Sequence, residues 1–380
     1  MRILRLYIQG CGVFKSNLID FTHDGEPQNL ICLAGVNGSG KTTVMELVFS
    51  LISFLNPSFT LEDIYFDRLK PHILTRVDFA QLDILVNDRT LSIIWGTNIQ
   101  RQKKADERSI TDYIIINPQL RQNILDIERD MLKSPKGDEI SELKKMMTRH
   151  IMLKRFNNKK NSGISPHIQF RPLSKLLEEI SSRNSKVLIL ASETAKTLPL
   201  VYFFNAHDRE IHDIHYTAIP KDIYEYQLVS RYHPRKDDIK KSLIYYDYAY
   251  PTEFEKLKTW INEYVLVDKD IEEIDRPNFE VIIRTQKNGT THGLELLSSG
   301  EESLLIVAIQ CFLRASKNAV FMIDEVDQSL HPEFQEKIMM LLTQLQKDTD
   351  CQIIVSSHSE IIWRMFDTQG LIDLTSVVMA

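Results

Sequence analysis

The N-terminal part of the chain places hydrophobic residues in short runs of strand length. The runs are Ile3 to Ile8, Leu18 to Phe21 and Leu30 to Ala34. Polar, Gly and Pro residues bound each run, which predicts three strands. A longer apolar stretch, Thr43 to Leu55, predicts a helix directly after the third strand, and Pro57 predicts the end of that helix.

Two further apolar runs flank Asn87-Asp88 and predict a β-hairpin that joins an antiparallel sheet. They span Val77 to Val86 and Leu91 to Trp95. From residue 98 to residue 277 the pattern changes, because helical stretches alternate with polar joins that contain Pro and Gly. These stretches are Leu120 to Lys133, Ile140 to Phe156 and Leu173 to Ile180. The pattern predicts a mainly helical insertion.

The last third of the chain returns to strands and helices. A strand from Pro199 to Asn205 comes first, and a polar segment with Arg209 follows it. Arg209 could reach a phosphate, but a surface loop explains the segment as well, so we leave it out of the candidate site. The later predicted elements are the strands Phe279 to Thr285, Ala319 to Ile323 and Gln352 to Ser356, and a helix from Ser303 to Leu313. Continuous apolar strands combined with helices predict an α/β fold.

Composition limits the class of protein. With 380 residues, 43% of them hydrophobic, the chain can build a sizeable core. Its four cysteines lie far apart without C-x-x-C spacing, which argues against a disulfide framework or a zinc site and favours the cytoplasm. No apolar run approaches the roughly 18 residues that span a bilayer, so we expect no membrane partner. The net charge is −6, so nucleic-acid binding would need a local basic patch.

The segment Gly35-Val36-Asn37-Gly38-Ser39-Gly40-Lys41-Thr42 fits the phosphate-loop pattern G-x-x-x-x-G-K-[ST] between a predicted strand and a predicted helix. Glycines let backbone N–H groups face an anion, the lysine adds charge for the outer phosphates, and the threonine hydroxyl suits Mg²⁺. We therefore expect ATP or a similar triphosphate, and Mg²⁺. The candidate nucleotide-binding residues are Asn37, Gly38, Ser39, Gly40, Lys41, Thr42 and Thr43, with Thr42 also a candidate metal ligand. The alternative is a turn that binds nothing.

Polar residues also follow the two buried C-terminal strands. Asp324-Glu325 follows the first, and His358 follows the second. Because the carboxyl ends of parallel strands share one edge of a sheet, these side chains should emerge beside the phosphate loop. Ser298, Ser299 and Gly300 open the predicted helix, and the N–H groups of a helix N-terminus suit a phosphate. Taken alone, that segment is only a serine-capped helix start.

The order and spacing of these motifs resemble those of the ATP-binding-cassette (ABC) ATPases, in particular the SMC, RecF and OLD-like branch. Leu297 to Glu301 resembles the signature motif, Val320 to Glu325 the Walker B strand, Ser329 to Pro332 the D-loop region, and His358 the switch histidine. In the signature of this chain, serine replaces the first glycine and glutamate replaces the glutamine.

The resemblance implies an α/β ABC-ATPase head, which is a P-loop NTPase with a mixed sheet, interrupted by a large, mainly helical insertion. Residues 1–97 would form the N-terminal part of the head with Walker A, 98–277 the insertion, and 278–380 the C-terminal part with the signature, Walker B and the switch histidine. Gln81 and Gln119 are both candidates for the Q-loop glutamine of the family.

The resemblance also implies a mechanism for Mg²⁺-dependent ATP hydrolysis. Asp324 would hold Mg²⁺ through water, Glu325 would orient and deprotonate the attacking water, and His358 would contact the γ-phosphate. Ser298, Ser299 and Gly300 would serve the nucleotide of the other protomer. The implied active unit is a head-to-tail homodimer or a higher even oligomer. A structural salt bridge at Asp324-Glu325 is the alternative.

The predicted insertion contains the most basic window of the chain. Between Lys133 and Lys160 there are nine basic and three acidic residues. Such a window is either a solvated helix face or a site for the phosphates of DNA or RNA. A group of four tyrosines could stack nucleic-acid bases, although we expect packing in the core or an interface. They are Tyr245, Tyr246, Tyr248 and Tyr250.

The sequence ends soon after His358, without the C-terminal nuclease domain of OLD-like enzymes, so we expect effector chemistry to lie in another polypeptide. Compact ATPases of this kind are similar to the ATPase subunits of bacterial antiphage systems such as Septu, some retron cassettes and the PARIS type. We therefore expect an ATPase that controls a separate nuclease or toxin. The alternatives are a RecF-like DNA-repair ATPase, a nucleotide-gated scaffold with slow turnover, and, less in keeping with the insertion, a transporter subunit.

Overall fold

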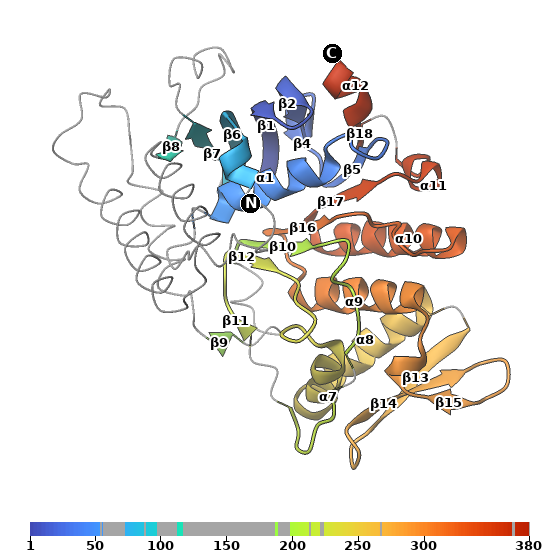
Figure 1. The fold of residues 1–380 in the computed structure, drawn as a ribbon. Coiled ribbons are helices and arrows are strands. Elements are labelled where there is room, and N and C mark those ends of the chain that lie inside the picture. Colours follow the sequence, from blue (N-terminus) through green and yellow to red (C-terminus); the bar gives the residue numbers. More distant parts are fainter. Residues whose placement is uncertain are drawn as a thin grey trace, which may run out of the picture.

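Two sheets with a helix between them organise the chain (Figure 1). The computed structural model describes residues 1–53, 55, 73–86, 89–96, 112–116, 187–188, 198–212, 214–220, 224–266, 268–366 and 369–379. One sheet is largely antiparallel and contains the N-terminal strands. The other is parallel and contains the strands that lead into the phosphate loop, Asp324-Glu325 and His358. The fold is therefore α/β with mixed strand directions, as the sequence predicts.

The first sheet has five strands in the order β2-β1-β6-β7-β8. Their bounds are Arg2–Cys11 for β1, Phe14–Asp20 for β2, Phe79–Val86 for β6, Arg89–Gly96 for β7 and Asp112–Ile116 for β8. The predicted hairpin is present, because β6 and β7 pair in antiparallel register with Val86 opposite Arg89. β8 pairs with β7 in parallel, which makes this sheet mixed.

The central sheet has six parallel strands in the order β12-β10-β16-β17-β5-β18. They are β5 (Leu30–Ala34), β10 (Leu200–Phe204), β12 (Val229–Arg231), β16 (Ala319–Ile323), β17 (Gln352–Ser357) and β18 (Leu371–Asp373). Val320 and Met322 of β16 face one hydrophobic core, whereas Phe321 and Ile323 face the other. A strand buried on both faces needs apolar residues at every position, which explains its continuous apolar run.

Helices cover both faces of the central sheet. On one face α1 (Lys41–Ser53) lies between the two sheets, and on the other lie α9 (Ser299–Arg314) and α10 (Pro332–Thr349) (Figure 1). Next to α9 lie α7 (Ile239–Ala249), α8 (Pro251–Tyr264) and a small sheet of β13 (Lys269–Asp275), β14 (Glu280–Thr285) and β15 (Thr291–His292). The C-terminal elements are α11 (Glu360–Trp363) and α12 (Leu374–Met379).

Short elements complete the described ranges. They are β3 (Thr22–His23), β4 (Glu26–Pro27), β9 (Val187–Leu188), β11 (Tyr224–Glu225), and the 3-10 helices η2 (Ile73–Arg76) and η4 (Leu294–Leu296). α9 begins earlier than the predicted start at residue 303, because Ser298 caps it with its side chain.

The segment expected as an insertion contributes to the central sheet. β10 pairs with β16 on one side and with β12 on the other, so residues 200–204 and 229–231 belong to the nucleotide-binding fold. The three predicted helical stretches and the basic window lie outside the described residues, so the boundaries 98 and 277 stay predictions. The tyrosine group lies on and next to α7, where Tyr246 is buried and its ring lies 5.5 Å from that of Tyr250.

Candidate functional site

The phosphate loop joins the end of β5 to the start of α1, and its glycines allow a conformation that other residues rarely adopt. Gly38 and Gly40 have φ angles of 82° and 94°. A Cβ atom on Gly40 would lie 2.5 Å from the ring of Phe14. The loop curls around the buried side chain of Lys41, whose Nζ donates to the carbonyl oxygens of Gly35, at 2.7 Å, and Val36, at 3.1 Å. The chain therefore forms a cradle of backbone and lysine charge.

The remaining loop residues lie around this cradle. Asn37 and Gly38 are exposed, Thr43 is half-buried, and Ser39 is buried. The hydroxyl of Ser39 has no hydrogen-bond partner among the described residues. An unpartnered buried hydroxyl at a glycine-rich turn is consistent with a ligand that completes the site.

Asp324, directly after β16, meets the first turn of α1. The hydroxyl of Thr42 donates to Oδ2 of Asp324 at 2.8 Å, although 282 residues separate the two in sequence. Oxygen ligands of this kind, a hydroxyl and a carboxylate, are those that Mg²⁺ prefers. The residues that sequence reasoning assigned to the metal thus lie in contact.

Ser356, the penultimate residue of β17, connects the two acidic residues of Walker B. Its hydroxyl donates to Oδ1 of Asp324 at 2.6 Å and accepts the backbone N–H of Glu325 at 2.7 Å. Glu325 has a φ of 47°, in the left-handed region, which costs roughly 1–3 kcal/mol for a residue other than glycine. The hydrogen bond from its N–H to Ser356 holds this turn, in which Glu325 is half-buried.

His358 follows β17 and pairs with Asp327. Its Nδ1 lies 3.0 Å from Oδ2 of Asp327, whose side chain is 2% exposed, whereas that of His358 is 47% exposed. A carboxylate at Nδ1 fixes the ring orientation and leaves Nε2 for another partner. Sequence reasoning identified His358 but missed Asp327.

The signature segment forms the N-terminus of α9. Ser298 and Glu301 make a capping box: the hydroxyl of Ser298 accepts the N–H of Glu301, and Oε2 of Glu301 accepts the N–H of Ser298 at 2.8 Å. Lys269 of β13 forms an ion pair with the other carboxylate oxygen of Glu301. Burial raises the pKa of Glu301, but the bonds from Lys269 and Ser298 outweigh burial and lower it. The glutamate at this position is therefore held as a carboxylate.

Ser298 and Ser299 are exposed, and Gly300 packs against the D-loop region, since a Cβ atom there would lie 3.2 Å from the carbonyl oxygen of Ser329. Within the described ranges, no hydrogen bond joins these three residues to the phosphate loop of the same chain. The structure thus brings Walker A, Walker B and His358 together and leaves the signature facing outward.

Burial shifts the pKa of two groups in the site. It lowers the pKa of Lys41, which the carboxylates of Glu325, Asp324 and Asp327 oppose. It raises the pKa of Asp324, which the hydrogen bonds from Ser356 and Thr42 oppose. Burial thus destabilises the charged form of both groups. The carboxylates oppose this effect for Lys41, and the hydrogen-bond donors oppose it for Asp324.

Arg209 is buried although its loop has exposed residues, so the interpretation of Arg209 as an exposed loop residue was wrong. The residue is 6% exposed, and its guanidinium lies beneath the Walker B turn, where Nη2 donates to the carbonyl oxygen of Glu325 at 2.7 Å. Burial lowers the pKa of Arg209 to about 10, and Asp324 opposes this shift, so the guanidinium stays charged at neutral pH. The polar residues around Arg209 gave no local sign in the sequence that its side chain would be buried.

One of the two Q-loop candidates forms its hydrogen bond within the antiparallel sheet. Gln81 lies in β6, is buried, and donates to Oδ1 of Asp83 at 3.0 Å. Gln119 lies outside the described residues.

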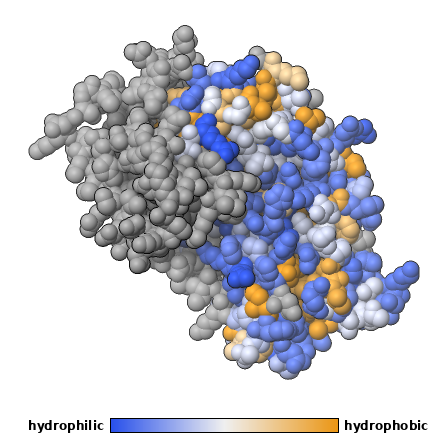
Figure 2. Space-filling model, viewed as in Figure 1, coloured by the Kyte–Doolittle hydropathy of each residue, from blue (hydrophilic) through white to orange (hydrophobic). Residues whose placement is uncertain are grey.

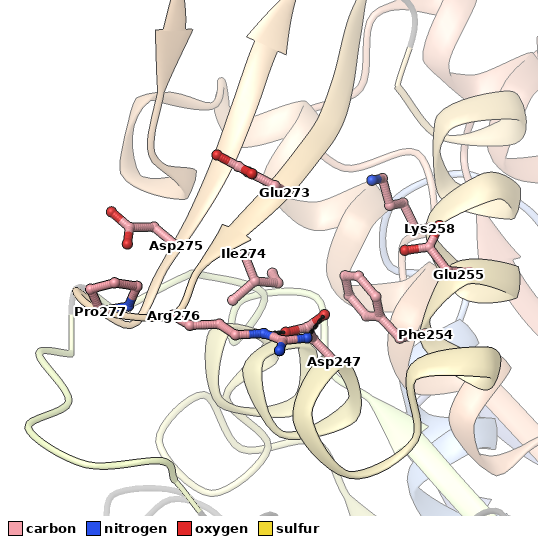
Figure 3. A pocket seen from close by; sticks show the side chains of 9 residues that line it. All are labelled: Asp247, Phe254, Glu255, Lys258, Glu273, Ile274, Asp275, Arg276 and Pro277. Carbon is pink, nitrogen blue, oxygen red and sulfur yellow. Dashed lines mark hydrogen bonds and ion pairs between the residues drawn. The ribbon is translucent and has the colours of Figure 1, made fainter.

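Another pocket, of about 430 Å³, lies between α7, α8 and the turn after β13 (Figure 3). Its charged side chains include Asp247 and Arg276, which pair at 2.7 Å. Lys258 donates to the backbone oxygen of Glu272 at 2.5 Å. None of the Walker, signature or switch residues lines this pocket, so we do not connect it with the nucleotide.

The residues present fit a nucleoside triphosphate and Mg²⁺. The glycine conformations, the enclosed Lys41 and the unpartnered hydroxyl of Ser39 form an anion cradle. The hydroxyl of Thr42 and the carboxylate of Asp324 supply hard oxygen ligands beside it.

The chain is similar to one protein family and to several solved structures. The family described as "AAA ATPase domain" (AAA_15) matches residues 1–363. The SMC head domain from Thermotoga maritima is 14% identical, with a TM-score of 0.38 over 97% of this chain and 93% of that one. The Smc head domain of Pyrococcus furiosus, solved with an extended coiled coil and bound to the C-terminal domain of ScpA, is 13% identical, with a TM-score of 0.37 over 96% and 91%.

An SmcHead bound to the C-winged helix domain of ScpA is 14% identical, with a TM-score of 0.40 over 96% of this chain and 92% of that one. No curated protein sequence matches this chain. In the parts of the chain that the structure describes, no helix has the length and apolar character needed to cross a membrane.

Proposed function

This chain belongs to the AAA ATPase domain family, and we propose that it hydrolyses ATP in a head-to-tail homodimer that controls a separate effector protein. One observation carries the proposal: Thr42, Asp324, Ser356 and Glu325 form a continuous hydrogen-bonded chain between the phosphate loop and the ends of β16 and β17. This chain links the phosphate loop to the backbone N–H of Glu325, the residue whose carboxylate we propose acts on water.

Each residue of this chain has a distinct proposed role. Lys41 and the loop N–H groups bind the phosphates, and Thr42 and Asp324 hold Mg²⁺, which when bound neutralises charge on the phosphate oxygens. Glu325 orients the attacking water and accepts its proton. His358, fixed by Asp327, offers Nε2 to the γ-phosphate as negative charge develops there.

The outward position of the signature segment supports an active site shared between protomers. Ser298 and Ser299 are exposed at the N-terminus of a helix of 16 residues, and Gly300 packs on the D-loop region. Free N–H groups at this end can bind the phosphates of a nucleotide held by a second copy. ATP would then close the dimer, and hydrolysis would loosen it.

For the wider role we propose antiphage defence in the bacterial cytoplasm, where the dimer holds a nuclease or toxin and releases or activates it. The motif order of the SMC, RecF and OLD-like branch supports this role. The coloured part of the face in Figure 2 is mostly hydrophilic, with hydrophobic residues in small groups between hydrophilic ones. Nucleic acid would have to bind through the basic window, outside the described residues.

The test is the Glu325→Gln variant, expressed with its neighbouring genes and purified in Mg²⁺-ATP. We expect ATP binding to persist, hydrolysis to fall roughly 10²-fold or more, and the native mass to exceed that of two subunits because an effector polypeptide co-purifies. Glu336→Gln is the matched control, since Glu336 is exposed on α10 and should leave turnover unchanged.

The outcomes separate the parts of the proposal. Turnover of Glu325→Gln equal to that of the parent would refute Glu325 as the base. A monomer in Mg²⁺-ATP would refute the shared site. A dimer without another polypeptide that retains DNA would favour a RecF-like DNA-repair ATPase over effector control.

A further inference from the structure

The loop after β10 places a buried arginine against the back of the Walker B turn. Nη2 of Arg209 lies 2.7 Å from the carbonyl oxygen of Glu325 and 3.2 Å from that of Asp324. Longer contacts of 3.5 Å reach the carbonyl oxygen of Ala206 and Oε1 of Gln328. One nitrogen with two hydrogens cannot satisfy four acceptors, so the short bond to Glu325 dominates.

Burial of this guanidinium is not explained by the stability of the fold. Its Nε and Nη1 atoms are buried and have no hydrogen-bond partner among the described residues. The nearby carboxylates of Asp324, Asp327 and Glu325 favour its charge, yet none of them makes a direct ion pair with it in the described part of the chain. Buried donors without partners lower the stability of the fold. The position of the Arg209 guanidinium beneath the Walker B turn therefore calls for a functional explanation.

The contact with Glu325 offers that explanation. Glu325 adopts a left-handed conformation, and two backbone contacts fix it: its N–H donates to Ser356 in front, and its carbonyl oxygen accepts from Arg209 behind. These two bonds define the peptide planes on both sides of the Cα atom of Glu325. They therefore set the direction in which its carboxylate points.

The same loop contacts the turn at a second point, because Nε2 of Gln328 lies 3.0 Å from Nδ1 of His207. The loop is anchored in turn by Asn205, whose Oδ1 accepts from Arg231 of β12, while Arg231 pairs with Glu46 of α1 at 2.7 Å. A chain of polar contacts thus runs from the Walker A helix through β12 and the loop after β10 to Walker B.

We propose that Arg209 is a positioning residue for ATP hydrolysis, which holds the backbone of Glu325 so that its carboxylate faces the attacking water. The inference rests on the proposed role of Glu325 and deepens it. We assign Arg209 no contact with the nucleotide or the attacking water, so it acts only through the Walker B turn. Its contribution therefore appears in kcat and not in the affinity for ATP.

The experiment compares Arg209→Met and Arg209→Lys with the parent protein and with Arg314→Met, by steady-state ATP hydrolysis in Mg²⁺. Arg314 is the control, because it is another arginine with a largely buried side chain, 6% exposed, but it pairs with Asp237 at 3.1 Å, away from Walker B. We expect Arg209→Met to lower kcat by about 10²-fold with KM within about twofold, as a small misplacement of a catalytic group does. Arg209→Lys should recover part of this loss.

A second comparison shows whether Arg209 acts through Glu325. In a Glu325→Gln background, the additional Arg209→Met substitution should cause little further loss, because the group it positions is already gone. Multiplicative losses in the double variant would overturn the proposal. So would a fall in kcat of Arg314→Met as large as that of Arg209→Met, or a change in KM alone.

These results are distinguishable from failure of the proposed function. If Glu325→Gln turned over like the parent, the catalytic role of Glu325 would fail whatever Arg209 does. If Glu325→Gln were inactive while Arg209→Met and Arg209→Lys kept the parent kcat, only the role of Arg209 would fail. Should Arg209→Met not fold, Arg209→Lys in both backgrounds gives the same comparison.

Discussion

Ser356 offers the sharpest test of how the Walker B turn is held. It is fully buried and makes two hydrogen bonds that no other side chain replaces in the described site, one to the carboxylate of Asp324 and one from the N–H of Glu325. Ser356→Ala removes one oxygen atom and changes the volume little. The substitution therefore isolates the hydrogen bonds from packing.

The expected magnitude follows from the groups left without partners. A buried donor or acceptor that loses its partner costs about 1–3 kcal/mol, and two such groups remain after Ser356→Ala. We expect the free energy of unfolding to fall by about 2–4 kcal/mol, which lowers Tm by roughly 2–5 °C in a chain of this size. Because Glu325 also loses one of the bonds that fix its left-handed backbone, ATP hydrolysis should fall about tenfold.

The assay is thermal unfolding of nucleotide-free protein, followed by steady-state hydrolysis at a temperature where every variant is folded. Ser303→Ala is the matched control, since Ser303 is also buried but its hydroxyl has no partner among the described residues. It should change the free energy of unfolding by less than about 0.5 kcal/mol. Equal shifts in the two variants would refute the reasoning, because the bonds of Ser356 would then contribute nothing.

Two further predictions concern charge. Burial raises the pKa of Asp324 above its ordinary 3.8, so the folded state binds its proton more tightly and the carboxylate lowers stability at neutral pH. Asp324→Asn should therefore raise Tm of the nucleotide-free protein at pH 7.5, and the gain should shrink as the pH falls towards 4; a gain that grows on acidification would contradict this. Lys269→Met should destabilise the fold by about 3 kcal/mol, because it leaves the carboxylate of Glu301 buried without its ion partner. Adding Glu301→Gln should restore most of the lost Tm, and no recovery in the double variant would exclude the ion pair as the cause.

The two parts of the candidate nucleotide site could be recognised in the sequence because their signals are local. The phosphate loop depends on glycines at fixed spacing and on the strand and helix that flank it, all within residues 30–53. The Walker B strand and β17 were recognisable as continuous apolar runs, since both of their faces are buried. The contact of Thr42 with Asp324 followed from the rule that ligands lie at the carboxyl ends of parallel strands.

Other residues could not be assigned because their role depends on distant parts of the chain. β10 reads as a strand in sequence, but only its pairing with β16, more than one hundred residues away, places it in the central sheet. Arg209 resembles an ordinary surface arginine, and its burial is decided by the carbonyl oxygens of Asp324 and Glu325. Asp327 and Ser356 gave a weaker signal, as polar residues next to or within buried segments.

The sequence by itself determined the class of ligand, since the phosphate loop and the acidic end of β16 need only local backbone geometry and the order of the motifs. The tertiary structure decided how the turn at Glu325 is held. Glu325 has a left-handed backbone and is held between Ser356 of β17 and Arg209 of the loop after β10. This arrangement requires β10, β16 and β17 to be in register. That register is set by packing in two hydrophobic cores, which no short stretch of sequence contains.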